Sequence, residues 1–103
     1  MGDIYRVDYG TVGGGGTQII SKSQSISSST TITVSELSEI KSVYFELHSS
    51  PTYKGAGFLL EGGTLKTVNS SNVPNGYGIT AISGNTFTIN WNGDTIDMYA
   101  VGA

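Results

Sequence analysis

The stretch ISGNTFTINWNGDTIDMYAVGA, residues 82–103, decides the fold class. Within it, the segment TFTINW alternates between polar and apolar residues, so Phe87, Ile89 and Trp91 share one face of an expected strand. The short segments SGN and NG on either side are typical of hairpin connections. Together with GITAI before it and TIDMYAVG after it, TFTINW predicts a three-stranded antiparallel meander. We expect Trp91 to close the end of the core next to NG rather than to bind a ligand.

The same alternation recurs upstream. In KSVYFELH, residues 41–48, we expect Val43, Phe45 and Leu47 to face the core. STTITV and TLKTVN are typical of two further strands, and GFLLEGG of a short buried one. SELSEIK is either one helical turn or a connection between strands. The whole pattern predicts about seven or eight short strands, and therefore an all-β fold: a single small antiparallel β-sandwich, jelly-roll-like or immunoglobulin-like, over residues 18–103.

Residues 1–17, MGDIYRVDYGTVGGGGT, are expected to form an N-terminal arm. Its four consecutive glycines, residues 13–16, have no side chains to bury, which predicts a flexible joint. Ahead of this joint lie the candidates for contacts with a neighbouring subunit: Ile4, Tyr5, Val7 and Tyr9. The alternative is that the arm is a frayed terminus.

Composition excludes several classes of function. The chain has 103 residues, a net charge of −3 and only five Lys and Arg residues, which argues against binding to nucleic acid or to an anionic membrane surface. No apolar run approaches the roughly 18 residues of a membrane-spanning helix. Asp3 and Asp8 stand where a signal peptide would carry Lys and an apolar run, so we expect no secretion by that route. With no Cys, the chain has neither disulfides nor zinc–thiolate sites.

No group of residues predicts a catalytic, cofactor or metal site. The single His, His48, lies at the end of an expected strand, and the chain lacks the G-x-S-x-G turn of serine hydrolases. Asn92, Asp94 and Asp97 provide too few oxygens for calcium, and NG-D is also what a tight turn selects. The glycine run lacks the Lys-Ser/Thr of a phosphate-binding loop.

Aromatic residues in expected loops leave a binding role open. An aromatic ring can stack on the apolar face of a sugar while amide groups bind its hydroxyls. Tyr53, Asn75 and Tyr77 are the candidates for such a ligand-facing surface, and a cell-surface glycan is the corresponding partner. Ordinary surface tyrosines are the alternative explanation.

The C-terminal run AISGNTFTINWNGDTIDMYAVG, taken with the earlier SSSTTITVSELSEIKSVYFEL, resembles the small β-domains of bacteriophage virion proteins from tails, baseplates, fibres and capsid surfaces. The matching residues of the hairpin and last strand are Ser83, Gly84, Asn85, Phe87, Thr88, Ile89, Tyr99, Ala100 and Gly102. The resemblance extends from about Ser27 onward, and residues 1–17 match no part of it.

The resemblance implies a non-enzymatic structural component that is commonly homo-oligomeric and often trimeric around an axis. Its partners would be other virion or assembly subunits, and its place would be the virion, assembled in the host cytoplasm. A lectin-like or receptor-binding β-module is the alternative function, and the two can coexist in one particle.

Overall fold

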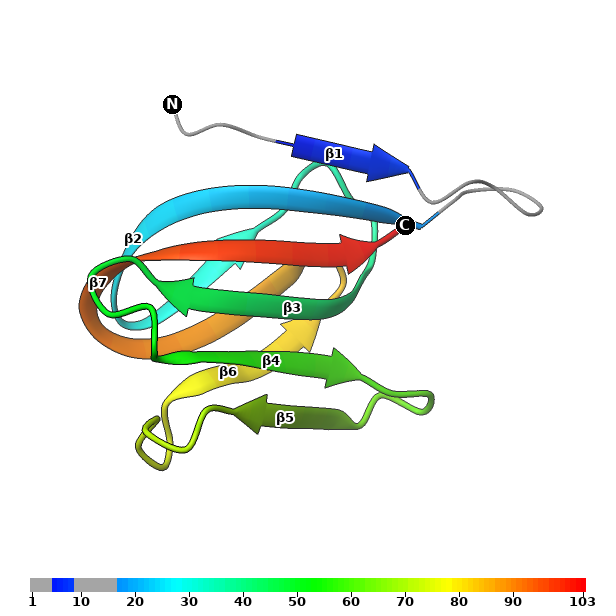
Figure 1. Cartoon of the computed structure of the whole chain (residues 1–103). Coiled ribbons are helices and arrows are strands. Elements are labelled where there is room, and N and C mark those ends of the chain that lie inside the picture. Colours follow the sequence, from blue (N-terminus) through cyan, green and yellow to red (C-terminus); the bar gives the residue numbers. More distant parts are fainter. Residues whose placement is uncertain (1–4, 9–16) are drawn as a thin grey trace.

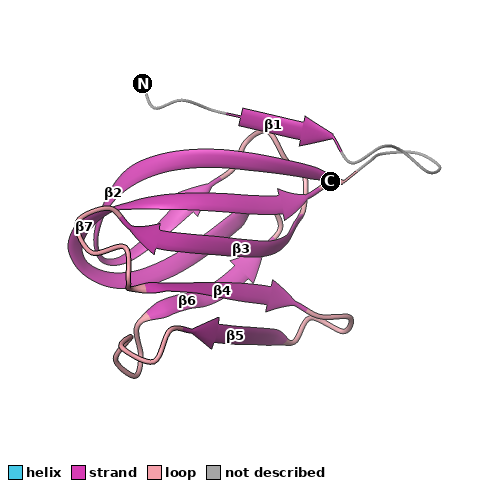
Figure 2. Cartoon of the chain, viewed as in Figure 1, coloured by secondary structure: helices cyan, strands magenta, loops and turns pink. Residues whose placement is uncertain are grey.

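The computed structural model describes the backbone of residues 5–8 and the whole of residues 17–103. The described residues form strands and turns without a helix (Figure 2). The strands are β1 (Tyr5–Asp8), β2 (Gln18–Thr33), β3 (Ile40–Leu47), β4 (Lys54–Leu59), β5 (Leu65–Asn69), β6 (Gly78–Ser83) and β7 (Thr86–Gly102). The prediction of an all-β fold is confirmed.

All described strands belong to one antiparallel sheet of seven strands. Its order is β1-β2-β7-β3-β4-β5, and β6 pairs with β7 outside this path. The last strand in the sequence is therefore central, and β1 and β5 lie at the two ends of this order (Figure 1). Since β5 follows β4 through a short turn, β4 and β5 form an edge hairpin.

The strands β2 and β7 are long and bent, with 16 and 17 residues. They pair along their whole length, and the register shifts once, where Ser27 of β2 faces both Asn92 and Gly93 of β7. Such an extra residue is a β-bulge, which bends a strand and increases its twist. The predicted hairpin at NG is therefore wrong: TFTINW and TIDMYAVG are two halves of one strand. The hairpin predicted at SGN, between β6 and β7, is confirmed.

The bend lets the sheet fold over on itself around a single core. The first half of β7 pairs with β6 and its second half with β3, so the two halves lie in facing parts of the sheet (Figure 1). Close approach of the two parts requires a glycine, because a Cβ at Gly57 of β4 would lie 2.7 Å from Cγ2 of Ile79 in β6. The largest fully buried side chains are Phe45, Phe87, Ile20, Ile40, Leu47, Ile89, Ile96, Met98, Val34 and Val43.

Individual strand predictions have mixed outcomes. In β3, Val43, Phe45 and Leu47 face the core, as expected. SELSEIK forms a turn, in which the Leu37 amide donates to the Val34 carbonyl, and no helix. GFLLEGG contributes to β4, but the prediction that this strand is buried is wrong, since one side of β4 is open to solvent.

Part of the expected arm belongs to the sheet. Residues Tyr5–Asp8 form β1, which pairs with β2 of the same chain; Tyr5 lies opposite Ser21 and Val7 opposite Ile19. The remaining residues of the arm, including Ile4, Tyr9 and the glycine joint, lie outside the described residues.

Candidate functional site

The candidate site is the outer face of β7, β3, β4 and β5, which is the side turned away from the core. Residues that pair across antiparallel strands project on the same side of a sheet. The register places Tyr99 opposite Tyr44, Tyr44 opposite Ala56, and Ala56 opposite Val68. This row crosses all four strands, and Phe58 lies one row further along β4. We call Tyr44, Ala56, Phe58, Val68 and Tyr99 the apolar face.

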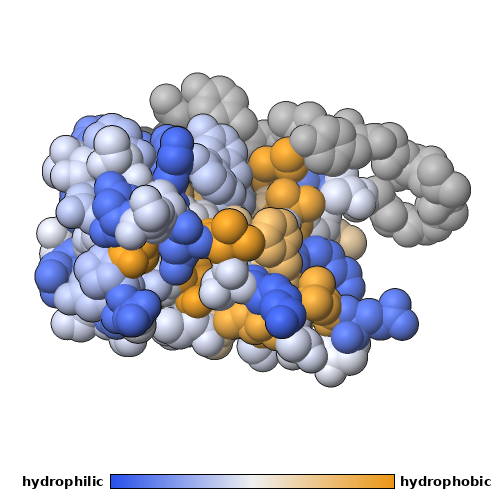
Figure 3. Space-filling view, turned by 60° about the horizontal axis from the view of Figure 1, so that its bottom comes forward, coloured by the Kyte–Doolittle hydropathy of each residue, from blue (hydrophilic) through white to orange (hydrophobic). Residues whose placement is uncertain are grey.

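The apolar face is accessible to solvent. Val68 is 65 %, Tyr99 42 % and Phe58 41 % exposed. In the space-filling view, hydrophobic residues gather in a band between hydrophilic ones (Figure 3). Such a contiguous exposed apolar surface with polar surroundings is typical of an interaction site.

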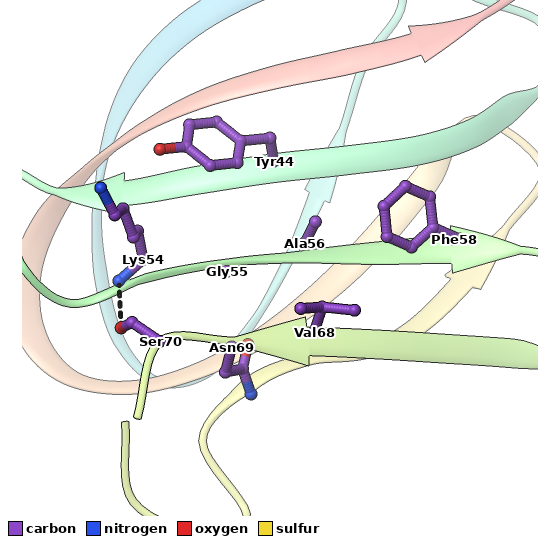
Figure 4. Close-up of a pocket in the computed structure, with 8 residues that line it drawn as sticks. All are labelled: Tyr44, Lys54, Gly55, Ala56, Phe58, Val68, Asn69 and Ser70. Atoms are coloured by element: carbon purple, nitrogen blue, oxygen red, sulfur yellow. Dashed lines mark hydrogen bonds between the residues drawn. The ribbon is translucent and has the colours of Figure 1, made fainter. Parts of the chain in front are cut away.

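A shallow hollow of about 500 Å³ lies over β4 and β5. Its floor is low because Ala56 carries only a methyl group, while the rings of Tyr44 and Phe58 rise on either side of Ala56 (Figure 4). Val68 lines it from β5, and Lys54, Asn69 and Ser70 complete its lining. On the opposite side of β4, a Cβ at Gly55 would collide with the Asn69 amide, so this position requires a glycine.

Charged side chains beside the apolar face are divided between its two halves. Glu46 of β3 and Asp97 of β7 lie opposite each other at one end of the aromatic half. The other half carries Lys54 on β4 and Lys66 on β5. Neither lysine forms an ion pair with a described carboxylate, although Lys54 lies opposite Glu46 in the register.

The Tyr44 ring is held in place by Glu46. The Tyr44 hydroxyl donates a hydrogen bond to Glu46 Oε2 at 2.7 Å, and the ring centroid lies 6.1 Å from that of Tyr99. Partial burial, together with this hydrogen bond and the negative charge of Glu46, raises the pKa of Tyr44 to about 12. Glu46 therefore orients one wall of the hollow.

We predict a titration that reports this arrangement. Because the pKa of folded Tyr44 is raised from 10.0 to about 12, its contribution to stability is complete below pH 10 and is lost as the pH rises towards 12. Ultraviolet titration should show a phenol that ionises at about pH 12, and Tyr44→Phe should remove this step while Tyr53→Phe leaves it in place. A step at about pH 12 that survives Tyr44→Phe would contradict the arrangement.

A polar cluster lies at the bend of β7. Asp97 accepts a hydrogen bond from the Ser23 hydroxyl at 2.5 Å, and its other carboxylate oxygen lies 3.6 Å from Nδ1 of His48. Asp94 accepts from the Thr95 amide at 2.7 Å and from the Ser49 hydroxyl, and these bonds lower the pKa of Asp94.

This cluster is not a nucleophilic triad. The His48 ring lies 3.6 Å from Asp97 and makes no described side-chain hydrogen bond to a serine, so no hydroxyl has a base placed to remove its proton. Within residues 17–103, no group of three or more His, Asp or Glu side chains is placed to hold a metal ion. What the cluster does is join β2, β3 and β7 at the bend through side-chain hydrogen bonds.

The predicted ligand-facing loops lie at a different place. Tyr53 and Tyr77 are partly buried and pack edge-on against Trp91, with ring centroids 5.3 and 5.0 Å from it. Trp91 is 9 % exposed and also contacts Phe45, so the expectation that it belongs to the core is confirmed. Both tyrosines are therefore less exposed than the sequence predicts, and their role as ligand-facing residues stays a prediction. Asn75 is exposed in the turn before β6.

Sequence reasoning did not find the apolar face. Its only signal was the presence of apolar residues on both faces of the same strands: Tyr99 alternates with buried Met98 and Ala100, and Phe58 lies between Gly57 and Leu59. In a half-exposed strand, polar residues would be expected at these outward positions.

Comparisons of the chain with protein-family models, with curated proteins and with solved structures find no match. Among the described residues, there is no helix of the length and apolar character needed to cross a membrane.

Proposed function

We propose that this chain is a non-enzymatic structural or assembly component of a phage-like particle, in which it forms a homo-oligomer or docks on a neighbouring virion protein. The fold supports this proposal at the level of class, because the described strands form an all-β antiparallel sheet folded over one core. The resemblance of SGNTFTI and YAVG to virion β-domains is the reason for proposing a phage-like particle as the assembly.

The observation that carries the proposal is the exposed apolar face next to a free sheet edge. A protein that acts alone in water gains nothing from presenting two aromatic rings and a valine on one open surface, since each is stabilised only when it is removed from water. A component of an assembly buries such a surface against its neighbour. The face lies on strands rather than on loops.

The strand β1 provides a second way to join subunits. It is a four-residue strand added to the free edge of β2, and an equivalent edge exists on every copy of the chain. Strand addition to a neighbour's sheet uses the same backbone hydrogen bonds and alternate side chains. The arm can therefore bind to its own sheet or to that of an adjacent subunit.

The test is the composition of purified particles. We expect quantitative mass spectrometry of particles released by cells that encode the chain to find it in several copies per particle. Removal of residues 1–16 should reduce its incorporation, and a variant with Thr33→Lys, at an exposed position away from both candidate contacts, should be incorporated normally. Recovery of the chain only outside the particles would overturn the proposal; specific binding on a glycan array by the assembled chain would favour the lectin-like alternative.

A further inference from the structure

We infer that the apolar face binds the same face of a second copy of this chain, in a two-fold symmetric, face-to-face contact. This inference rests on the proposed function and names the surface and the partner through which the chain would assemble. Isologous contacts between identical chains need a surface that is complementary to itself. The apolar face meets this requirement in charge and in shape.

The charges on the face are self-complementary. One half, made by β7 and β3, carries Asp97 and Glu46; the other half, made by β4 and β5, carries Lys54 and Lys66. Lys41 adds no net charge because it pairs with Glu39 at 2.7 Å. A partner of one charge sign would match one half of the face and repel the other, whereas a second copy can place Glu46 of each chain against Lys54 of the other.

The shapes of the two halves are also complementary. The half formed by β7 and β3 projects the rings of Tyr99 and Tyr44, whose centroids lie 6.1 Å apart. The half formed by β4 and β5 contains the hollow above Gly55 and Ala56 (Figure 4). Projecting rings on one half therefore face a depression on the other half of a second copy.

A single two-fold axis can place Glu46 against Lys54 and the projecting rings against the hollow. If the axis runs parallel to the strands between β3 and β4, it exchanges β3 with β4 and β7 with β5. Tyr44 then meets Ala56 of the second copy, Tyr99 meets its Val68, and Glu46 meets its Lys54. Sheets that pack face to face with nearly aligned strands are common within domains, at a spacing of about 10 Å. The Lys54 side chain, which has no described ion-pair partner within its own chain, gains one in the dimer.

The size of the face sets the expected affinity. Four strands about 4.8 Å apart, with their side chains, cover a face roughly 20 Å square, so a dimer would bury about 800 Å² in total, in the range of weak and transient contacts. We therefore expect a dissociation constant on the order of 100 µM for the isolated chain. Sedimentation velocity of the full chain between about 1 and about 500 µM should show a monomer–dimer equilibrium.

The decisive experiment uses charge reversal in two separate chains. Glu46→Lys alone would place lysines against lysines across the axis, and Lys54→Glu alone would place acids against acids, so each should raise the dissociation constant by at least about tenfold. Mixed in equal amounts, the two variants should form a heterodimer, because Glu46→Lys chains then face Lys54→Glu chains with opposite charges at both contacts. Native mass spectrometry distinguishes this heterodimer from either homodimer by mass.

Two controls separate this outcome from others. Val68→Ser should weaken the dimer without a change of charge, and Thr33→Lys, on an exposed position at the end of β2, should leave it unchanged; circular dichroism establishes that each variant is folded. A chain that stays monomeric up to about 500 µM, or variants that are weakened singly but not rescued by mixing, would overturn the inference. Either result leaves the proposed function intact if the chain is still found in particles, whereas its absence from particles would refute that function and leave the dimer standing.

Discussion

Trp91→Ala is expected to lower the free energy of unfolding by about 3–5 kcal/mol, the largest effect of any single substitution that we predict. A domain of this size is stable by only about 5–15 kcal/mol, so the variant should lie close to the limit of folding at room temperature. The loss is large because the indole is 9 % exposed and holds together three other aromatic rings.

The geometry around Trp91 explains why its removal cannot be repaired locally. Its ring centroid lies 6.5 Å from Phe45, 5.3 Å from Tyr53 and 5.0 Å from Tyr77, and these rings come from β3, from the turn before β4 and from the turn before β6. Trp91 itself precedes the bulge in β7. A cavity at this point would loosen two turns and the bend together, because the rings that cover Trp91 would lose their common partner.

The measurement is urea unfolding followed by far-ultraviolet circular dichroism, since the variant lacks the only Trp and its fluorescence. Tyr99→Ala is the matched control: it removes an aromatic ring from the same strand, but from the outer face where the ring is 42 % exposed. At low protein concentration we expect Tyr99→Ala to cost less than about 1 kcal/mol. Equal losses for the two variants would show that Trp91 is not a core residue.

The sequence was sufficient to predict strands in which apolar residues on one side alternate with polar residues on the other. In β3, Val43, Phe45 and Leu47 alternate with polar or amphipathic residues, and period-two alternation admits one orientation towards a core. The hairpin at SGN was predictable for the same reason, because Gly84, with φ of 59°, adopts the conformation that tight turns require. These features depend on neighbours in the sequence alone.

The bend in β7 could not be predicted, because NG has two structural meanings. The same two residues can reverse a chain as a hairpin turn or can form a bulge within one strand. The choice depends on β2, whose length allows pairing with β7 on both sides of the bulge. Ser28 of β2 has φ of 53° at this place, and nothing in a run of serines indicates which of them takes that conformation.

The apolar face was hidden for a related reason. Pattern reasoning assigns apolar side chains to the core, so it predicts that Phe58 in GFLLEGG is buried, and it does not connect Tyr99 with aromatic residues of other strands. Only the register shows that Tyr99, Tyr44, Ala56 and Val68 form one row. The separation of acidic and basic residues into two halves likewise depends on strand order, in which β7 lies beside β3 and β5 beside β4.

Gly102→Ala should destabilise the protein by about 1–3 kcal/mol, the cost that is typical of forcing a methyl group into a closely packed site. A Cβ at Gly102 would collide with the Glu39 carbonyl oxygen and lie 3.0 Å from Cα of Ile40. Both obstacles are backbone atoms and cannot rotate away. The end of β7 must then move outward, which breaks the hydrogen bonds between Ala103 and Glu39 in both directions, at 3.0 and 3.1 Å.

Gly93→Ala is the control, and it also tests the bulge. In the structure, a Cβ at Gly93 would meet only the Ile26 carbonyl oxygen, at 3.9 Å, and Gly93 is not among the glycines with positive φ. The substitution should therefore be neutral or should stabilise the protein by up to about 1 kcal/mol, since alanine restricts the unfolded chain. If NG were a hairpin turn instead, Gly93 would need a positive φ and alanine would cost stability. Thermal unfolding of Gly102→Ala and Gly93→Ala thus separates one continuous strand from two, because the continuous strand predicts a loss in the first variant alone.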